Sequence, residues 1–311
     1  MICIFHRTDY DGKCAGAIVK HRFPDIRLYG MDYADKFDIE KIEPNEEVIM
    51  VDFTLGKPGE MLALAKRCGT FTWIDHHKTC KGVEEELIAH NSLLEPLGIR
   101  QVSINPNDPE GKDPTSRISA CEMTWQYFYP ERSMPYAVWL LGRYDVWDKS
   151  NEETWVNYIL PFQYGMRLVH GHPEDQKFWK PYFITDEQSG LIHKTLIAGN
   201  AALDYDNNLS ERIAKSLWFP IEFMGYKFQA INRSHGNTHS AKSIWDPENY
   251  DAIMYFCKGP DTWRITMFTN KEGIDLFPLA KEMGGGGHSQ ACGFTTEKII
   301  ETLPQLIEFN I

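Results

Sequence analysis

The sequence predicts an α/β protein, with a parallel sheet in its N-terminal part, a helical connector and a smaller C-terminal α/β domain with a mixed sheet. Short apolar runs alternate with segments of helical periodicity through the first 75 residues, and this alternation is typical of βαβ units. Carboxylate and imidazole residues directly follow three of the apolar runs. Strand-like runs return only after residue 218, which indicates a second sheet.

The N-terminal elements follow from this alternation. Four short apolar runs predict strands, near residues 1–6, 26–31, 47–52 and 70–75. Two segments with apolar residues at helical spacing predict helices, near residues 12–22 and 58–68. The first helix is expected to begin at Gly12, so that its N-terminus faces the crevice at the strand ends.

The sequence pattern of the remaining chain changes twice, first to mostly helical and then to strand-like. Residues 116–218 are mostly helical in pattern, with prolines as breaks. Strand-like runs follow at 219–231, 251–257 and 263–269, and a last helix is expected near 297–309. These changes predict domains over residues 1–185 and 215–311, joined by a helical linker over residues 186–214. Residues 105–115 are rich in turn formers and are expected to form an exposed loop.

Composition excludes several classes of protein. Of 311 residues, 42% are hydrophobic and 24% charged, as in an ordinary globular protein. No apolar run approaches the roughly 18 residues that span a bilayer, and no signal-peptide pattern is present, so we expect no membrane association and a cytoplasmic location. The net charge of −12 argues against binding to long nucleic acids. Seven cysteines without a C-x-x-C pair are expected to be reduced thiols.

Polar residues with metal-binding side chains follow three predicted strands. His6, Asp9 and Asp11 follow the first, Asp52 the third, and Asp75-His76-His77 the fourth. The carboxyl ends of parallel strands meet at one edge of a sheet, so these side chains should converge, and Asp145 is expected to join them. Four clustered carboxylates repel one another unless cations balance them. The sequence therefore predicts two divalent ions, held by oxygen and imidazole ligands.

These residues resemble the motifs of the DHH phosphoesterases, a family named for a triplet present here as Asp75-His76-His77. The first family motif resembles His6-Arg7-Thr8-Asp9-Tyr10-Asp11-Gly12, and the second resembles Val51-Asp52-Phe53. The C-terminal associated domain of the family carries a signature that resembles Gly285-Gly286-Gly287-His288. The resemblance covers nearly the whole chain and is strongest to oligoribonuclease and nucleotide phosphatase members.

The resemblance implies a role for each motif residue. One metal would be held by His6 and Asp9, the other by Asp11, His76 and Asp145, and Asp52 would bridge the two. Asp148 is an equally good alternative to Asp145. Catalytic roles would fall to Asp52, to His77, which would contact the substrate phosphate with help from Arg143 or His288, and to Asp75. Asp75 would orient a histidine by accepting its second ring proton.

The second domain is expected to select the substrate. The glycine run would let backbone amides approach a phosphate, and the expected contacts are Arg233, Ser243, Gly285, Gly286, Gly287, His288 and Ser289. A flexible loop is the competing interpretation of this run. The sequence His170-Gly171-His172 is interpreted as a surface loop, because no carboxylate accompanies it.

These observations predict a metal-dependent phosphodiesterase or phosphatase. It would hydrolyse short oligonucleotides or small nucleotides, with two metal ions activating water. Mn²⁺ is the expected metal, with Mg²⁺ or Fe²⁺ as alternatives. An exopolyphosphatase or pyrophosphatase is one alternative function, and a nucleotide-binding sensor without turnover is another. A homodimer is compatible with the sequence, which leaves the oligomeric state open.

Overall fold

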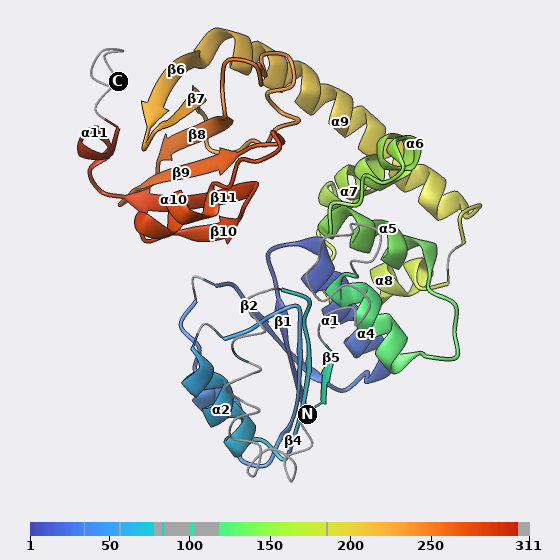
Figure 1. Ribbon diagram of the computed structural model, residues 1–311. Coiled ribbons are helices and arrows are strands. Elements are labelled where there is room, and N and C mark those ends of the chain that lie inside the picture. Colours follow the sequence, from blue (N-terminus) through green and yellow to red (C-terminus); the bar gives the residue numbers. More distant parts are fainter. Residues whose placement is uncertain are drawn as a thin grey trace. The chain divides into compact units, whose positions relative to one another are not determined.

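The structure is a computed structural model that describes residues 1–33, 35–55, 57–77, 83, 100–102, 118–184 and 186–303, without the side chains of Pro58, residues 100–102, His288 and Ile300. The turn-rich segment 105–115 and the end of the expected last helix lie outside the described residues. The chain divides into two compact units, Met1–Leu203 and Asp204–Ile311. Figure 1 shows the helices and strands of both units. Helix α9, Gly190–Leu217, runs through the division.

The first unit is built on a parallel sheet of five described strands in the order β2-β1-β3-β4-β5. The strands are β1 (Ile2–His6), β2 (Arg27–Met31), β3 (Glu47–Val51), β4 (Thr70–Ile74) and β5 (Arg100–Val102). The first four confirm the sequence prediction, whereas β5 was not predicted. The direction of winding reverses between β1 and β3, and such a switch point opens a crevice at the carboxyl ends of the strands.

Helices cover both faces of this sheet because successive strand residues point to opposite sides. Cys3 and Phe5 of β1 belong to a core with α1 (Tyr10–Arg22) and α4 (Ala120–Phe128). Ile2 and Ile4 instead belong to a core with α2 (Pro58–Arg67). Figure 1 shows α2 on one side of the sheet and the other two helices on the opposite side.

The remaining helices of the first unit extend the larger core. They are α5 (Tyr136–Asp145), the single turn α6 (Glu152–Thr154), a π-helical turn Trp155–Ile159, α7 (Leu160–Arg167) and α8 (Gln176–Tyr182). Trp125, Trp155 and Trp179 are buried in this core, while Trp147 is exposed. Among the described residues, no helix is long and apolar enough to cross a membrane.

The second unit contains a mixed sheet in the order β10-β11-β9-β8-β7-β6. Its strands are β6 (Trp218–Phe223), β7 (Tyr226–Asn232), β8 (Ala252–Lys258), β9 (Trp263–Phe268), β10 (Gly286–His288) and β11 (Ala291–Thr296), followed by α11 (Ile299–Thr302). Only β7 and β8 pair in parallel. The expected run 219–231 is two strands, because Met224 and Gly225 both take positive φ and form a hairpin turn.

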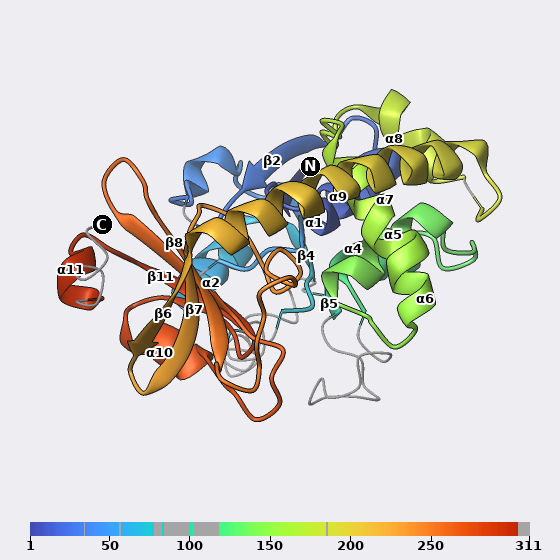
Figure 2. The ribbon, with the colours of Figure 1, turned by 90° about the horizontal axis from the view of Figure 1, so that it is seen from above.

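Two elements cover the faces of this second sheet. Helix α10 (Phe277–Glu282) contributes Leu279 and Ala280 to one core, together with Phe228 and Phe294. The C-terminal part of α9 contributes Ala214 to a smaller core on Ile231 and Tyr255. Figure 2 shows α9 as a single continuous helix. The six cysteines in the described segments are free thiols, as expected.

Helices α7 and α9 approach each other backbone to backbone. A Cβ at Gly165 would lie 2.2 Å from the Thr195 carbonyl oxygen, and a Cβ at Gly199 would lie 1.8 Å from the Pro161 carbonyl oxygen. Neither helix can move away without opening the core between them. These two glycines are therefore required by packing.

We expect Gly199→Ala to lower the free energy of unfolding by about 1–3 kcal/mol, because the added methyl group overpacks this contact. Gly190→Ala is the matched control in the same helix, since its Cβ would meet nothing within 4 Å. Urea unfolding of both variants measures the difference. Equal stability of the two variants would contradict the close packing of α7 and α9.

Candidate metal centre

The carboxyl ends of three strands form the floor of the candidate centre. His6 is the last residue of β1, Asp52 follows β3, and Asp75 follows β4. Phe5, Val51 and Ile74 pair across these strands, so the residues that follow them lie side by side. Asp52 is 1% exposed and takes a φ of 52°. This left-handed conformation is unusual for a residue other than glycine and is characteristic of functional sites.

Helix α1 delivers two further carboxylates. It begins at Tyr10, two residues before the predicted start, because Asp9 is its N-cap and accepts a 2.9 Å hydrogen bond from the Gly12 amide. Gly12 is required here, since a Cβ would lie 2.2 Å from the His6 carbonyl oxygen. The other oxygen of Asp9 lies 2.8 Å from His6 Nδ1. Capping thus aims one oxygen of Asp9 at the crevice.

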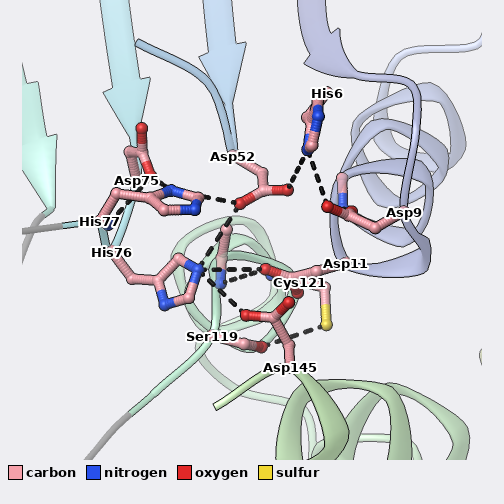
Figure 3. A network of polar contacts seen from close by, with 12 residues as sticks. His6, Asp9, Asp11, Asp52, Asp75, His76, His77, Ser119, Cys121 and Asp145 are labelled. Atoms are coloured by element: carbon pink, nitrogen blue, oxygen red, sulfur yellow. Dashed lines mark hydrogen bonds and ion pairs between the residues drawn. The ribbon is translucent and has the colours of Figure 1, made fainter. Parts of the chain in front are cut away.

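Two sets of ligand atoms meet at Asp52 (Figure 3). In the first, His6 Nδ1 lies 3.5 Å from Asp52 Oδ2 and faces Asp9. In the second, His76 Nε2 lies 3.6 Å from Asp52 Oδ1 and 3.1 Å from Asp145 Oδ2. Asp11 completes the second set, with Oδ2 3.6 Å from His76 Nε2. Asp52 therefore presents one oxygen to each set.

The N-terminus of α4 holds Asp11 in place. The Ala120 amide donates to Asp11 Oδ2 at 2.9 Å, and the Cys121 amide donates to Oδ1 at 2.8 Å. Ser119 and Glu122 form the capping box that begins this helix. The sequence analysis missed this support, although the Ser-x-x-Glu spacing at residues 119–122 marks the start of the helix.

Asp75 is completely buried and orients His77. Its Oδ1 lies 2.7 Å from His77 Nδ1, and its Oδ2 accepts a 2.5 Å hydrogen bond from the Thr54 hydroxyl. Asp75 could also form a metal set with Asp52, His76 and His77. Both of its oxygens already have partners, however, so the contacts favour an orienting role. Thr54 was not identified from the sequence.

The carboxylates buried in the crevice repel one another, and this repulsion shifts their pKa values. Burial and the neighbouring carboxylates of Asp52 and Asp145 raise the pKa of Asp11 well above its usual range. Burial and Asp9 also raise the pKa of Asp52. Burial alone would lower the pKa of His6, but the adjacent carboxylates of Asp52 and Asp9 outweigh it and raise that pKa to about 10.

These residues fit divalent cations. His6 Nδ1, His76 Nε2 and both oxygens of Asp52 are buried and have no well-formed hydrogen bond within the described part of the chain. Unpartnered buried polar atoms are costly, and one cation in each ligand set would satisfy all four. The donor set of carboxylate oxygens and imidazole nitrogens, without thiolate, suits Mn²⁺, Mg²⁺, Fe²⁺ or Zn²⁺.

The two candidates for the fourth carboxylate have different surroundings. Asp145, the last residue of α5, faces His76. Asp148 instead lies 3.4 Å from Arg143 and accepts hydrogen bonds from Ser150. Arg143 is buried and also pairs with Glu122. The expectation that Arg143 offsets phosphate charge is therefore not supported, because two carboxylates already balance its charge.

Comparisons with known proteins agree with this architecture. No family model matches the chain. An uncharacterized protein of Acanthamoeba polyphaga mimivirus is 22% identical, over 97% of this chain and 69% of that protein. The pGpG-specific phosphodiesterase PggH from Vibrio cholerae has a similar structure, with a TM-score of 0.53 and 12% identity over 100% of this chain and 96% of that chain.

A further structure is similar to the whole chain. The DHH domain of a member of a ribosomal-protein family has a TM-score of 0.58 and 15% identity, over 99% of this chain and 85% of that chain. The protein has the DHH fold. Its parallel N-terminal sheet and mixed C-terminal sheet agree with the predicted α/β class.

The predicted substrate residues lie in the second unit of this DHH fold. Arg233 donates to Ser210 at 2.8 Å and pairs with Asp206 at 3.5 Å, both on α9. Ser243 and Ser289 are exposed. The side chain of His288 lies outside the described part of the structure.

The glycine run is not the loop that one interpretation expected, since Gly286–His288 forms β10 and pairs with β11. Gly285 and Gly287 are required by this pairing, because a Cβ would lie 2.0 Å from the Gly293 carbonyl oxygen or 2.5 Å from that of Ala291. A Cβ at Gly286 would meet nothing within 4 Å. Packing therefore explains two of these three glycines.

We expect Thr54→Val to lower the free energy of unfolding by about 1–3 kcal/mol at neutral pH, because Asp75 loses a buried donor. Thr54→Ser keeps the hydroxyl and is the control. Although burial opposes it, the bonds from His77 and Thr54 hold the pKa of Asp75 below its usual value.

The stabilisation by Asp75 is therefore present above its unfolded pKa of about 4 and is lost as the pH falls through the folded value. The difference between the valine and serine variants should be nearly the same at about pH 5 as at neutral pH, because folded Asp75 stays ionised at both. Urea unfolding at both pH values measures it. A valine variant as stable as the serine variant at neutral pH would contradict the role of Thr54.

Proposed function

We propose that the protein is a metal-dependent hydrolase that cleaves phosphoester bonds of short oligonucleotides or small nucleotides. The observation that carries this proposal is Asp52, whose two oxygens face two separate ligand sets. A carboxylate that bridges two cations is the central ligand of two-metal phosphoester hydrolysis. The DHH fold of a phosphodiesterase specific for pGpG supports the same reaction class by analogy.

Two divalent ions, with Mn²⁺ as the expected metal, account for the ligand sets. His6 and Asp9 would hold one ion, while Asp11, His76 and Asp145 would hold the other. When bound, the ions lower the pKa of a shared water molecule and balance charge on the phosphate oxygens. The chain contributes preset geometry, because the Gly12 amide fixes Asp9 and the α4 amides fix Asp11.

His77 is suited to contact the scissile phosphate. Its Nδ1 is fixed by Asp75, so the ring can direct Nε2 at a ligand. Burial opposes protonation, but the hydrogen bond and charge of Asp75 raise the pKa of His77 to about 9. When the ring is protonated, Nε2 carries a proton and can donate to a phosphate oxygen. His77 would thus be a catalytic residue, with Asp75 positioning it.

The second unit would determine which nucleotide is accepted. Open space at Gly286 and the exposed backbone of β10 would let Gly285, Gly286 and Gly287 approach a phosphate, with His288 and Ser289 beside them. Arg233 and Ser243 would add further contacts. The net charge of −12 favours small substrates over long strands and is consistent with the cytoplasmic location that we expect.

We expect Asp145→Asn to weaken binding of one metal ion and to lower phosphodiesterase activity by more than about 100-fold. Asp148→Asn is the matched control, because Asp148 contacts Arg143 instead of the ligand set. Asp52→Asn should weaken both ions. Calorimetric titration with Mn²⁺ and initial rates on a dinucleotide measure these effects. Wild-type turnover in Asp52→Asn would refute the two-metal assignment.

A panel of substrates tests the choice of nucleotide. Initial rates with Mn²⁺ should be highest on a dinucleotide or adenosine bisphosphate and lower on pyrophosphate or polyphosphate. His288→Ala should reduce rates on nucleotides about tenfold more than on p-nitrophenyl phosphate, since one lost charge-assisted contact is worth about 1.5–3 kcal/mol. Pyrophosphate as the best substrate would favour a pyrophosphatase, and tight nucleotide binding without product would favour a sensor.

A further inference from the structure

Three aromatic rings gather around the end of α5, next to Asp145 of the second ligand set. Trp155 is buried, and the Tyr144 ring stacks on it with 5.7 Å between ring centroids and 8° between ring planes. The Trp147 ring packs edge-on against both, at 5.6 Å from Tyr144 and 4.9 Å from Trp155. These three residues form an aromatic cluster whose outer member is Trp147, which is 37% exposed.

The backbone of Trp147 has an unusual conformation for a tryptophan. Its φ is 55°, in the left-handed region. Its amide donates to the Tyr144 carbonyl oxygen at 3.1 Å, and the Asp148 amide donates to the Arg143 carbonyl oxygen at 2.9 Å. These two bonds form a Schellman motif at the end of α5, with Trp147 in the position where glycine is usual. A bulky residue is strained there, and such strain is concentrated at functional sites.

Packing against the core does not explain this placement. A ring selected for burial would be enclosed, as Trp155 is at 6% exposure, whereas more than a third of Trp147 is exposed. Trp155 itself begins the π-helical turn Trp155–Ile159. Such turns are rare and are frequently found at functional sites. Two backbone irregularities, the left-handed Trp147 and the π-helical turn, therefore meet in one cluster of rings.

Polar contacts fix the turn that carries Trp147. Asp148 lies 3.4 Å from the buried Arg143 and accepts hydrogen bonds from the amide and the hydroxyl of Ser150, at 3.1 and 2.6 Å. Because Trp147 follows Asp145 by two residues, their Cα atoms are at most about 7 Å apart. The exposed indole is therefore held beside the second ligand set, within the span of one nucleotide.

A cation accompanies the exposed ring. The Lys149 ammonium lies 4.5 Å from the centre of the Trp147 ring and 5.1 Å from that of Trp155. Aromatic rings hold this ammonium without cancelling its charge. An exposed aromatic ring beside a cation is the combination that binds single nucleotides of a strand, because the base stacks on the ring and the backbone is attracted to the charge.

We propose that Trp147 stacks on the nucleobase next to the phosphate that is cleaved. This inference rests on the proposed function and names a residue that determines its specificity. Stacking uses the π-face that every base has, so the site accepts nucleotides of any base and discriminates against phosphoesters without one. Lys149 adds a charge for the backbone beside the base. The first unit alone thus distinguishes a nucleotide from polyphosphate or a sugar phosphate.

Two ligands that differ only in the base test this contact. Adenosine 5′-monophosphate should bind the protein in Mn²⁺ more tightly than ribose 5-phosphate, as measured by calorimetry. Trp147→Leu should weaken binding of the nucleotide about 5- to 150-fold, the loss expected for one stacked base, and leave that of ribose 5-phosphate within about twofold. Trp218→Leu is the matched control and should change neither affinity, since Trp218 is also 37% exposed but lies in the second unit.

Trp147→Gly is a second variant that suits the left-handed position and so keeps the end of α5 intact. It should show the same base-dependent loss as Trp147→Leu. Wild-type affinity of the glycine variant for adenosine 5′-monophosphate would overturn the proposal. So would equal losses on the two ligands, an equal effect of Trp218→Leu, or a wild-type protein that does not prefer the nucleotide. Absence of dinucleotide hydrolysis by the wild-type protein refutes the proposed function instead, and the binding measurements then decide the stacking contact alone.

Discussion

Mutual repulsion among buried carboxylates is the constraint on which the candidate centre depends. Asp11 and Asp52 are almost fully buried, and burial together with their acidic neighbours raises the pKa of each. Protonated histidines relieve part of this repulsion in the metal-free protein, as the raised pKa of His6 indicates. Cations relieve it more fully, because they also satisfy the unpartnered atoms. The fold thus stores an electrostatic strain that metal binding would remove.

Hydrogen bonds and backbone conformation around the crevice hold its carboxylates close together, so the repulsion between them persists. The amides of Gly12, Ala120 and Cys121 bind Asp9 and Asp11, so these carboxylates cannot turn away from one another. Asp52 is aimed by a left-handed backbone, and Asp75 fixes His77 from the opposite side. Such preset ligands lower the reorganisation that metal binding requires. The buried pair of Arg143 and Glu122 connects α5, which carries Asp145, to α4.

A cavity of about 450 Å³ lies beside Asp9 within the first unit. Its cations, Lys13 and Arg167, come from the helix that supplies Asp9 and Asp11 and from α7. The Tyr10 hydroxyl connects the start of α1 to the end of α7, so the positions of ligand and cavity are coupled.

The sequence by itself determined the α/β class, the four N-terminal strands and the residues that end them. Strand ends can be predicted from the sequence because the pattern is local. It is a short apolar run followed directly by Asp52 or by Asp75-His76-His77. Only the tertiary structure decided which oxygen of Asp52 faces which histidine, and that Asp148 pairs with Arg143 while Asp145 faces His76. It also decided that His170 and Gln163 border a cavity with Lys13. These facts depend on packing between segments about 150 residues apart, and local sequence patterns do not encode such distances.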